Sequence, residues 1–265
     1  MILHQHLQVS SRHGYSLIGE IHIPKGDGPF PAIIFLHGYR SSKESKKMVM
    51  LMEQVQDDYA CVRFDASGHG QSGGIFEDIT PTRYAEDGED VLAFLQKKNI
   101  PKLDLTKLAI YGSSLGGFVA GMIAAKHPEV KALMLFAPVS DFAFQKAECE
   151  KARKKGLSSI QLPFRRYGHI EIQCALAEDG ARYDFYRLSK NTYCPTIIFH
   201  GDQDEVIPLS QSKKLEKSLP HAELRIIEGA DHVFNDDAAL FKKMSEECRE
   251  FLKRHLNVPK SKEEK

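Results

Sequence analysis

Short apolar runs alternate with longer amphipathic ones along most of the chain, and this alternation limits the folds that the chain can adopt. The short runs are typical of buried strands, and the longer ones space their apolar residues as one face of a helix. Strands that alternate with helices predict right-handed crossovers and an α/β fold, with a mostly parallel central sheet flanked by helices. The predicted strands are Leu7–Val9, Leu17–Ile23, Ala32–Leu36, Ala60–Phe64, Leu108–Tyr111, Ala132–Phe136, Thr196–Phe199 and Leu224–Ile227. The predicted helices are Lys46–Gln56, Tyr84–Leu95, Leu115–Ala125, Leu209–Leu219 and Ala239–Leu256.

Residues 140–193 interrupt this alternation, because the stretch is far longer than one crossover helix requires. A long excursion at one point of an α/β sheet typically forms a lid or a binding loop. Its basic and aromatic residues fit a solvated helical insertion with its own small core, a surface that grips substrate, or both. We therefore expect a core at 1–139 and 194–258, a cap inserted after the sixth strand at 140–193, and a flexible tail at 259–265. The first two strands lack an intervening helix, so we expect them to form an antiparallel edge.

The segment Gly112-Ser113-Ser114-Leu115-Gly116 stands between a predicted strand and a predicted helix of small residues. A Gly-x-Ser-x-Gly turn in that setting predicts a nucleophile elbow, in which a strained backbone presents the central serine at the carboxyl edge of the sheet. The two glycines are required because side chains there would collide with the neighbouring strand and helix. The helix N-terminus behind Ser114 favours developing negative charge. Ser113 occupies the x position and is expected to face sideways.

A serine hydroxyl is a weak nucleophile at neutral pH and needs a base that is itself oriented by an acid. In this fold the acid and then the base follow the serine along the chain. Asp204, in the loop after Thr196–Phe199, is the predicted acid, and the alternative is Asp202, which otherwise caps the turn. His232, in the loop after Leu224–Ile227, is the predicted base. Because a general base must be neutral, we expect activity to fall on the acid side of about pH 6.5.

Two main-chain N–H groups are predicted to form an oxyanion hole. One belongs to Tyr39, in the loop after Ala32–Leu36, and the other to Leu115, directly after the nucleophile. Gly38 lets the backbone approach closely, so we expect its replacement to distort the hole. Each such donor is typically worth about 3–4 kcal/mol of transition-state stabilisation.

Other polar clusters have simpler interpretations. His37, His69 and His200 each stand beside a glycine at a strand end, but they lack the spacing of zinc ligands, so no metal is expected. The loop at 65–72 holds turn residues and is interpreted as a brace beneath the pocket. Neither a dinucleotide-binding Gly-x-Gly-x-x-Gly nor a P-loop occurs, so no cofactor is expected. The histidines upstream of all these motifs are given no role: His4, His6, His13 and His22.

Composition excludes several classes of partner. The chain has 36 Lys and Arg against 36 Asp and Glu, so it lacks the positive excess that nucleic acid or an anionic membrane surface requires. Its five cysteines are scattered and form no Cys-x-x-Cys, which favours a reducing compartment, and we expect a cytoplasmic protein. No run approaches about 18 consecutive apolar residues, and the polar start of the chain does not suggest a signal peptide. The sequence leaves open whether the chain forms a homodimer.

Taken together, these motifs resemble those of the α/β-hydrolase superfamily of serine hydrolases, from about Leu17 to Leu256. Within it the chain resembles the cinnamoyl/feruloyl esterase branch, whose cap lies where residues 140–193 fall. The segments that carry the resemblance are His37-Gly38-Tyr39, Gly68-His69-Gly70-Gln71-Ser72, the Ser114 elbow, Gly201-x-x-Asp204 and Gly229-Ala230-Asp231-His232-x-Phe234.

The resemblance implies a serine esterase that hydrolyses small carboxylic esters through an acyl-enzyme. Three residues would act as the catalytic triad: Ser114, Asp204 and His232. The same triad also serves thioesterases, monoglyceride lipase-like enzymes, acyltransferases and small peptidases, and these alternatives stay open. A non-catalytic binding protein of this fold is a further alternative, which the presence of every required residue type opposes.

Overall fold

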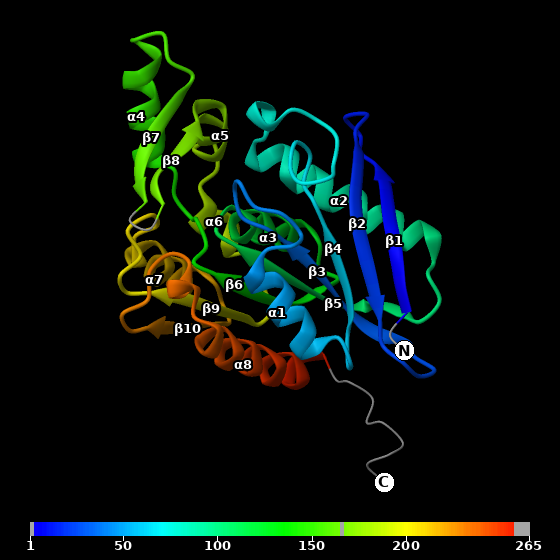
Figure 1. Ribbon diagram of the computed structural model, residues 1–265. Coiled ribbons are helices and arrows are strands. Elements are labelled where there is room, and N and C mark those ends of the chain that lie inside the picture. Colours follow the sequence, from blue (N-terminus) through cyan, green and yellow to red (C-terminus); the bar gives the residue numbers. More distant parts are fainter. Residues whose placement is uncertain (1–2, 165–166, 257–265) are drawn as a thin grey trace.

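The computed structural model describes residues 3–164 and 167–256, and its main feature is one large sheet (Figure 1). Within those ranges the sheet has eight strands in the order β1-β2-β4-β3-β5-β6-β9-β10. β2 runs antiparallel to β1 and to β4, and the remaining neighbours are parallel. The strands are β1 (Leu3–Ser10), β2 (Ser16–Ile23), β3 (Phe30–Leu36), β4 (Ala60–Phe64), β5 (Leu103–Ser113), β6 (Val130–Phe136), β9 (Thr196–Gly201) and β10 (Ala222–Ile227).

Helices cover both faces of this sheet, so the predicted α/β architecture and its antiparallel edge are confirmed. α1 and α8 bury their apolar faces on one side, and α2, α3, α6 and α7 bury theirs on the other. The bounds are α1 (Lys46–Val55), α2 (Pro81–Lys98), α3 (Leu115–Lys126), α6 (Phe185–Ser189), α7 (Leu209–Ser218) and α8 (Ala238–Leu256), with short 3₁₀ helices η1 (Phe76–Asp78) and η2 (Phe234–Asp236).

The continuous apolar runs of the central strands follow from this double cover. Successive side chains of a strand point to opposite faces. In β3, Ile33 and Phe35 therefore enter the core beneath α1 and α8, whereas Ile34 and Leu36 enter the core beneath α2 and α3. α3 is buried on nearly all sides, which explains why its sequence is apolar all round rather than amphipathic.

The predicted insertion after the sixth strand is present and stands at the upper left of Figure 1. Besides α6, it contains α4 (Ala143–Arg153), an antiparallel hairpin of β7 (Ser159–Phe164) and β8 (Gly168–Gln173), and α5 (Cys174–Gly180). The sequence interpretation did not foresee the hairpin. The alternative of a separate small core does not hold, because Phe142, Ile160 and Leu176 join the same apolar core as α2 and α3.

The sequence also predicted that no segment spans a membrane and that the C-terminal tail is flexible. No helix within 3–164 and 167–256 combines the length and the apolar character needed to cross a bilayer. The tail predicted at 259–265 lies outside the described residues.

Candidate active site

Ser114 occupies the sharp turn between β5 and α3. Its backbone has φ 54° and ψ −115°, a left-handed conformation that a residue with a side chain rarely adopts. A Cβ at Gly112 would collide with the carbonyl oxygen of Gly116, and a Cβ at Gly116 would collide with that of Leu36. The two glycines therefore permit the close approach of strand and helix that the tight turn requires, as the sequence predicted.

Ser114, His232 and Asp204 come together in one chain of hydrogen bonds. Nε2 of His232 lies 3.1 Å from Oγ of Ser114, and Nδ1 of His232 lies 2.7 Å from Oδ2 of Asp204. An ionised carboxylate can only accept, so Nδ1 carries the hydrogen and donates it. In a neutral ring Nε2 then has a free lone pair, which accepts the hydrogen bond from the serine hydroxyl.

The carboxylate of Asp204 is buried, and its environment keeps it ionised. Its Oδ1 accepts hydrogen bonds from the N–H groups of Val206 and Ile207, at 2.9 and 2.8 Å. Its Oδ2 lies 3.2 Å from Nε2 of His200, as well as next to His232. Burial raises the pKa of Asp204, but the charge of His232 and these hydrogen bonds outweigh burial and hold that pKa below its ordinary range.

The alternative acid has a different role. Oδ1 of Asp202 accepts a hydrogen bond of 2.8 Å from the N–H of Gly229, which ties the loop after β9 to the loop after β10. The alternative serine, Ser113, is the buried last residue of β5. The structure therefore brings the first-choice residues of the sequence interpretation together.

The loop that carries His232 is shaped by its own polar side chains. Oδ1 of Asp231 accepts from the N–H groups of Val233 and Asn235, at 3.0 and 2.7 Å. Phe234, Asn235 and Asp236 all have positive φ, so the chain reverses tightly after the histidine. Phe234 is fully buried against Phe136 and anchors this reversal in the core.

The two predicted oxyanion donors, Tyr39 and Leu115, line the same cavity as Ser114. Leu115 is the first residue of α3, and the first N–H groups of a helix have no intrahelical acceptor. The side chain of Tyr39 is held by the N–H of Gln173, which donates to its hydroxyl over 3.3 Å. The expectation for Gly38 was wrong, because an added Cβ would meet Ser113 O and Ser114 Cβ only at 3.4 and 3.5 Å, which are ordinary contacts.

A cavity of about 380 Å³ lies beside the serine and the histidine. This volume is in the range of pockets that hold a small organic ligand. The insertion supplies much of its apolar wall, including Phe164, whose ring lies edge-on to that of His232 at 6.2 Å between centroids. The apolar lining residues are Leu115, Val139, Phe142, Leu162, Phe164, Ile170, Ile172, Leu176, Val206, Ile207 and Val233, and the lining also includes the charged residues Arg40, Lys46, Lys47 and Asp236.

The polar loop at 65–72 packs beneath this region as a brace. His37 accepts the N–H of Ala66 at 3.0 Å, and Asp87 of α2 accepts both the N–H and the hydroxyl of Ser67. Among the described residues, His37, His69 and His200 do not form a group of converging metal donors.

Two family models match this chain, each over more than half of its length. The model described as X-Pro dipeptidyl-peptidase (S15 family) matches residues 13–156, and that described as serine hydrolase (FSH1) matches residues 97–240. The chain belongs to the α/β-hydrolase superfamily of serine hydrolases.

Individual relatives of this hydrolase include proteins named as a thioesterase and as a lipase. It is 27% identical over 80% of its length to the mitochondrial palmitoyl-protein thioesterase ABHD10 of Rattus norvegicus, of which it covers 72%. It is 24% identical over 77% of its length to the monoacylglycerol lipase ABHD6 of Homo sapiens, of which it covers 71%.

Solved structures show the same fold for the hydrolase. Est1E of Butyrivibrio proteoclasticus with bound ferulic acid superposes with a TM-score of 0.76 at 22% identity, covering 95% of this chain and 99% of that one. Mouse ABHD10 superposes with a TM-score of 0.78 at 22% identity, covering 94% and 99%.

Sequence reasoning missed the residues that support the site from outside its motifs. His200 was weighed only as a zinc ligand, although its place four residues before Asp204 could have marked it as a second partner of that carboxylate. Phe164 and Tyr167 reach the site from the hairpin; the sequence marked them only as two of the many aromatic residues of the insertion, and no motif singles them out.

Proposed function

We propose that this hydrolase cleaves carboxylic esters with an apolar acyl group, including aromatic acyl groups of the cinnamoyl/feruloyl type. The observation that carries the proposal is the hydrogen-bond chain from Asp204 through His232 to Ser114, beside a cavity with an apolar wall. The distances suit proton transfer between hydroxyl and imidazole.

The reaction follows from this geometry in two halves. Oγ of Ser114 attacks the acyl carbon while Nε2 of His232 takes its proton, and Asp204 stabilises the resulting imidazolium. The N–H groups of Tyr39 and Leu115 bind the oxyanion of the tetrahedral intermediate. His232 returns the proton to the leaving alkoxide, and water then releases the acid from the acyl-enzyme by the same steps.

The insertion is the substrate cap in this proposal, with 140–193 as cap and 1–139 and 194–258 as core. Its apolar side chains on β7, β8 and α5 face the cavity, so the acyl group lies against them. Because the described cap residues that line the cavity are uncharged, the cap favours apolar acyl chains over charged ones.

Thioester hydrolysis is a second candidate, favoured by the likeness to ABHD10, which is named a palmitoyl-protein thioesterase. A thioester needs the same nucleophile, base and oxyanion donors. Matched ester, thioester and amide substrates with one acyl group distinguish the two, and an X-Pro p-nitroanilide tests the peptidase activity that the S15 description names.

The test of the main proposal is a screen of p-nitrophenyl esters by acyl length, with methyl ferulate, on the wild type and Ser114→Ala. We expect kcat/KM to rise from acetate to longer acyl groups, and we expect Ser114→Ala to abolish both hydrolysis and labelling by a fluorophosphonate. A folded wild type that is not labelled would contradict serine catalysis. A labelled wild type that cleaves only thioesters or amides would contradict the ester assignment alone.

We also propose a cytoplasmic location. Its support is that all five cysteines are free thiols, as expected in a reducing compartment. The mitochondrial ABHD10 relatives make mitochondria the alternative, and fractionation of cells that express the full-length chain separates the two.

A further inference from the structure

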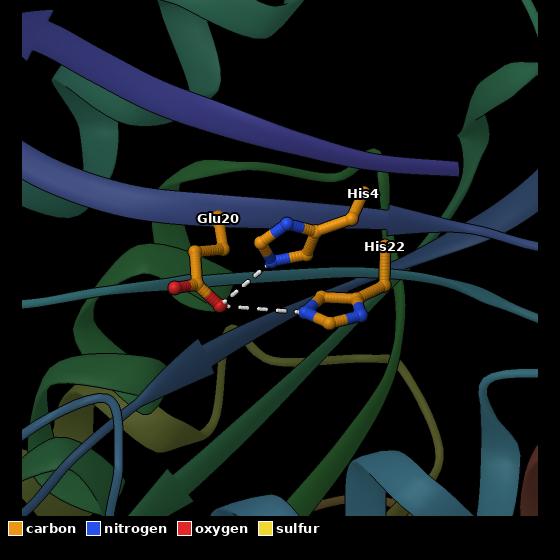
Figure 2. A group of neighbouring side chains, drawn as sticks. All are labelled: His4, Glu20 and His22. Atoms are coloured by element: carbon orange, nitrogen blue, oxygen red, sulfur yellow. Dashed lines mark hydrogen bonds and ion pairs between the residues drawn. The ribbon is translucent and has the colours of Figure 1, made fainter. Parts of the chain in front are cut away.

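Three donor atoms converge on one face of the antiparallel pair β1–β2 (Figure 2). His4 lies directly opposite His22 in the register of the two strands, and Glu20 precedes His22 by two positions, so it faces the same way. Nε2 of His4 is 3.1 Å from Oε2 of Glu20, and Nε2 of His22 is 3.4 Å from the same oxygen. Both imidazoles therefore point at one carboxylate oxygen.

These separations are close to those of ligands around a tetrahedral zinc ion. Zinc binds imidazole nitrogen and carboxylate oxygen at about 2.0–2.2 Å, which places neighbouring ligands of a tetrahedron about 3.3–3.6 Å apart. Of the two distances to Oε2 of Glu20, 3.4 Å lies within that range and 3.1 Å just below it, and the donor atoms of all three side chains lie within 4.8 Å of one another. One ion can fit among them after only small side-chain shifts.

The chemistry of the donors selects the metal. Two imidazoles and one carboxylate suit zinc, with a water in the fourth position, whereas magnesium and calcium prefer oxygen ligands throughout. Each histidine binds through Nε2 by carrying its hydrogen on Nδ1 instead, which needs no movement of the backbone.

Arg63 limits the affinity of this group of side chains for zinc. It is buried in β4 opposite Glu20 and donates to Oε2 over 3.0 Å. This bond holds the carboxylate of Glu20 in place, so zinc binding costs less conformational entropy at this side chain. Its positive charge also repels a cation, so we expect binding on the order of micromolar rather than the tighter binding of structural zinc sites.

We propose that His4, Glu20 and His22 form a zinc-binding site that clamps the edge hairpin β1–β2. The site is separate from the catalytic centre. In the sheet, β4 and β3 lie between β2, which carries Glu20 and His22, and β5, which ends at the turn that holds Ser114. Bound zinc therefore stabilises the fold and leaves the rate of hydrolysis unchanged.

The test is calorimetric titration of zinc chloride into the full chain without a histidine tag, at about pH 7.5, where free imidazole is mostly neutral. We expect one ion per wild-type chain and at least tenfold weaker binding for His4→Ala and His22→Ala. His13→Ala is the matched control, because His13 also pairs with a glutamate, Glu86 at 2.7 Å, yet belongs to no group of three donors in the described ranges.

A thermal melt with and without zinc gives a second readout. Zinc should raise the Tm of the wild type and of His13→Ala, and should leave that of His4→Ala unmoved. The side chain of His4 is 54% exposed, so this variant should fold. The proposal is overturned if the wild type binds no zinc at about 100 µM, which is well above the expected dissociation constant. It is also overturned if His4→Ala binds zinc as tightly as the wild type, or if His13→Ala loses as much zinc affinity as His4→Ala.

Discussion

The hydroxyl of Tyr167 donates a hydrogen bond of 2.8 Å to Oδ2 of Asp236, and this bond joins the β7–β8 hairpin to the loop that carries His232. Phe164, at the end of β7, meets the imidazole from the same side. The hairpin thus covers His232, the general base of the proposed triad, although more than sixty residues separate the two segments in the sequence.

Tyr167→Phe removes this bond and keeps the ring. A hydrogen bond of this kind contributes about 0.5–1.5 kcal/mol, so we expect kcat/KM for longer acyl esters to fall about 2- to 10-fold, mainly through KM. Acetate esters should be affected less, because they reach less of the cap. Steady-state kinetics on both esters measure this, with Tyr193→Phe as the control at a tyrosine that is 71% exposed. An equal loss for both esters would show that the bond does not act through the acyl wall.

Asp204→Asn and Asp202→Asn form a pair that separates the two candidate acids. In Asp204→Asn the new side-chain amide would offer a donor to Nδ1 of His232, which favours the imidazole tautomer that cannot accept the serine proton, so we expect kcat to fall by about 10³–10⁴-fold. Asp202→Asn keeps an oxygen that can accept the N–H of Gly229, so we expect activity within about 2-fold of wild type. The measurement is kcat on a p-nitrophenyl ester, and similar losses in both variants would count against Asp204 as the acid.

The same carboxylate bears on the acid limb of the pH profile. Its pKa lies below the ordinary range, so Asp204 stays ionised wherever the protein is folded at mildly acidic pH. A loss of activity between about pH 4 and 6 is therefore not expected to come from protonation of this carboxylate, and the pH profile of kcat/KM on a p-nitrophenyl ester measures it.

Sequence patterns predicted the sheet and the Ser114 elbow well, because both depend on local rules. A buried strand must be apolar, and a strand-to-helix turn as tight as that at Ser114 leaves no room for side chains at Gly112 and Gly116. The order of nucleophile, acid and base along the chain then limited the choice to a few loop residues. Strand alternation likewise indicated the edge pair β1–β2.

Contacts between distant segments could not be predicted in the same way. The strands β7 and β8 do alternate apolar with polar residues, so this local signal was present in the sequence and was not used. What the alternation does not give is the partner of the apolar face, which here is the cavity beside Ser114. The convergence of His4, Glu20 and His22 depends on the register of β1 against β2, which cannot be read from the sequence. Gly38 was misjudged because a glycine beside a catalytic loop indicates close approach only when the space around it is known.

The space around the glycines leads to a stability prediction. A Cβ at Gly116 would collide with the carbonyl oxygens of Leu36, the last residue of β3, and of His37 directly after it, and these backbone atoms cannot move aside cheaply. We expect Gly116→Ala to lower the free energy of unfolding by about 3 kcal/mol or more, or to prevent folding. Gly38→Ala should change it by less than about 1 kcal/mol, because its Cβ would make ordinary contacts. Urea denaturation measures both, and equal destabilisation would contradict the described packing.

Asp87 of α2 gives a prediction for stability against pH. Its side chain is fully buried, and in the described part of the chain its Oδ1 has no hydrogen-bond partner, while Oδ2 accepts both bonds from Ser67. Burial raises the pKa of Asp87 to about 6, and the bonds from Ser67 only partly oppose this. Folding therefore favours the protonated acid.

The sign of the effect follows from the raised pKa. The stabilising contribution of protonated Asp87 is fully present below the unfolded pKa of about 4 and is lost as the pH rises through about 6, with a total of about 3 kcal/mol. The side chain of Asn cannot titrate, so the free energy of unfolding of Asp87→Asn should not show this decrease between about pH 4 and 6. Urea denaturation across that window, with the exposed Asp57→Asn as control, measures the difference. If Asp87→Asn and the wild type decline in parallel, Asp87 is ionised in the folded protein throughout and the buried acid is not the source of the pH dependence.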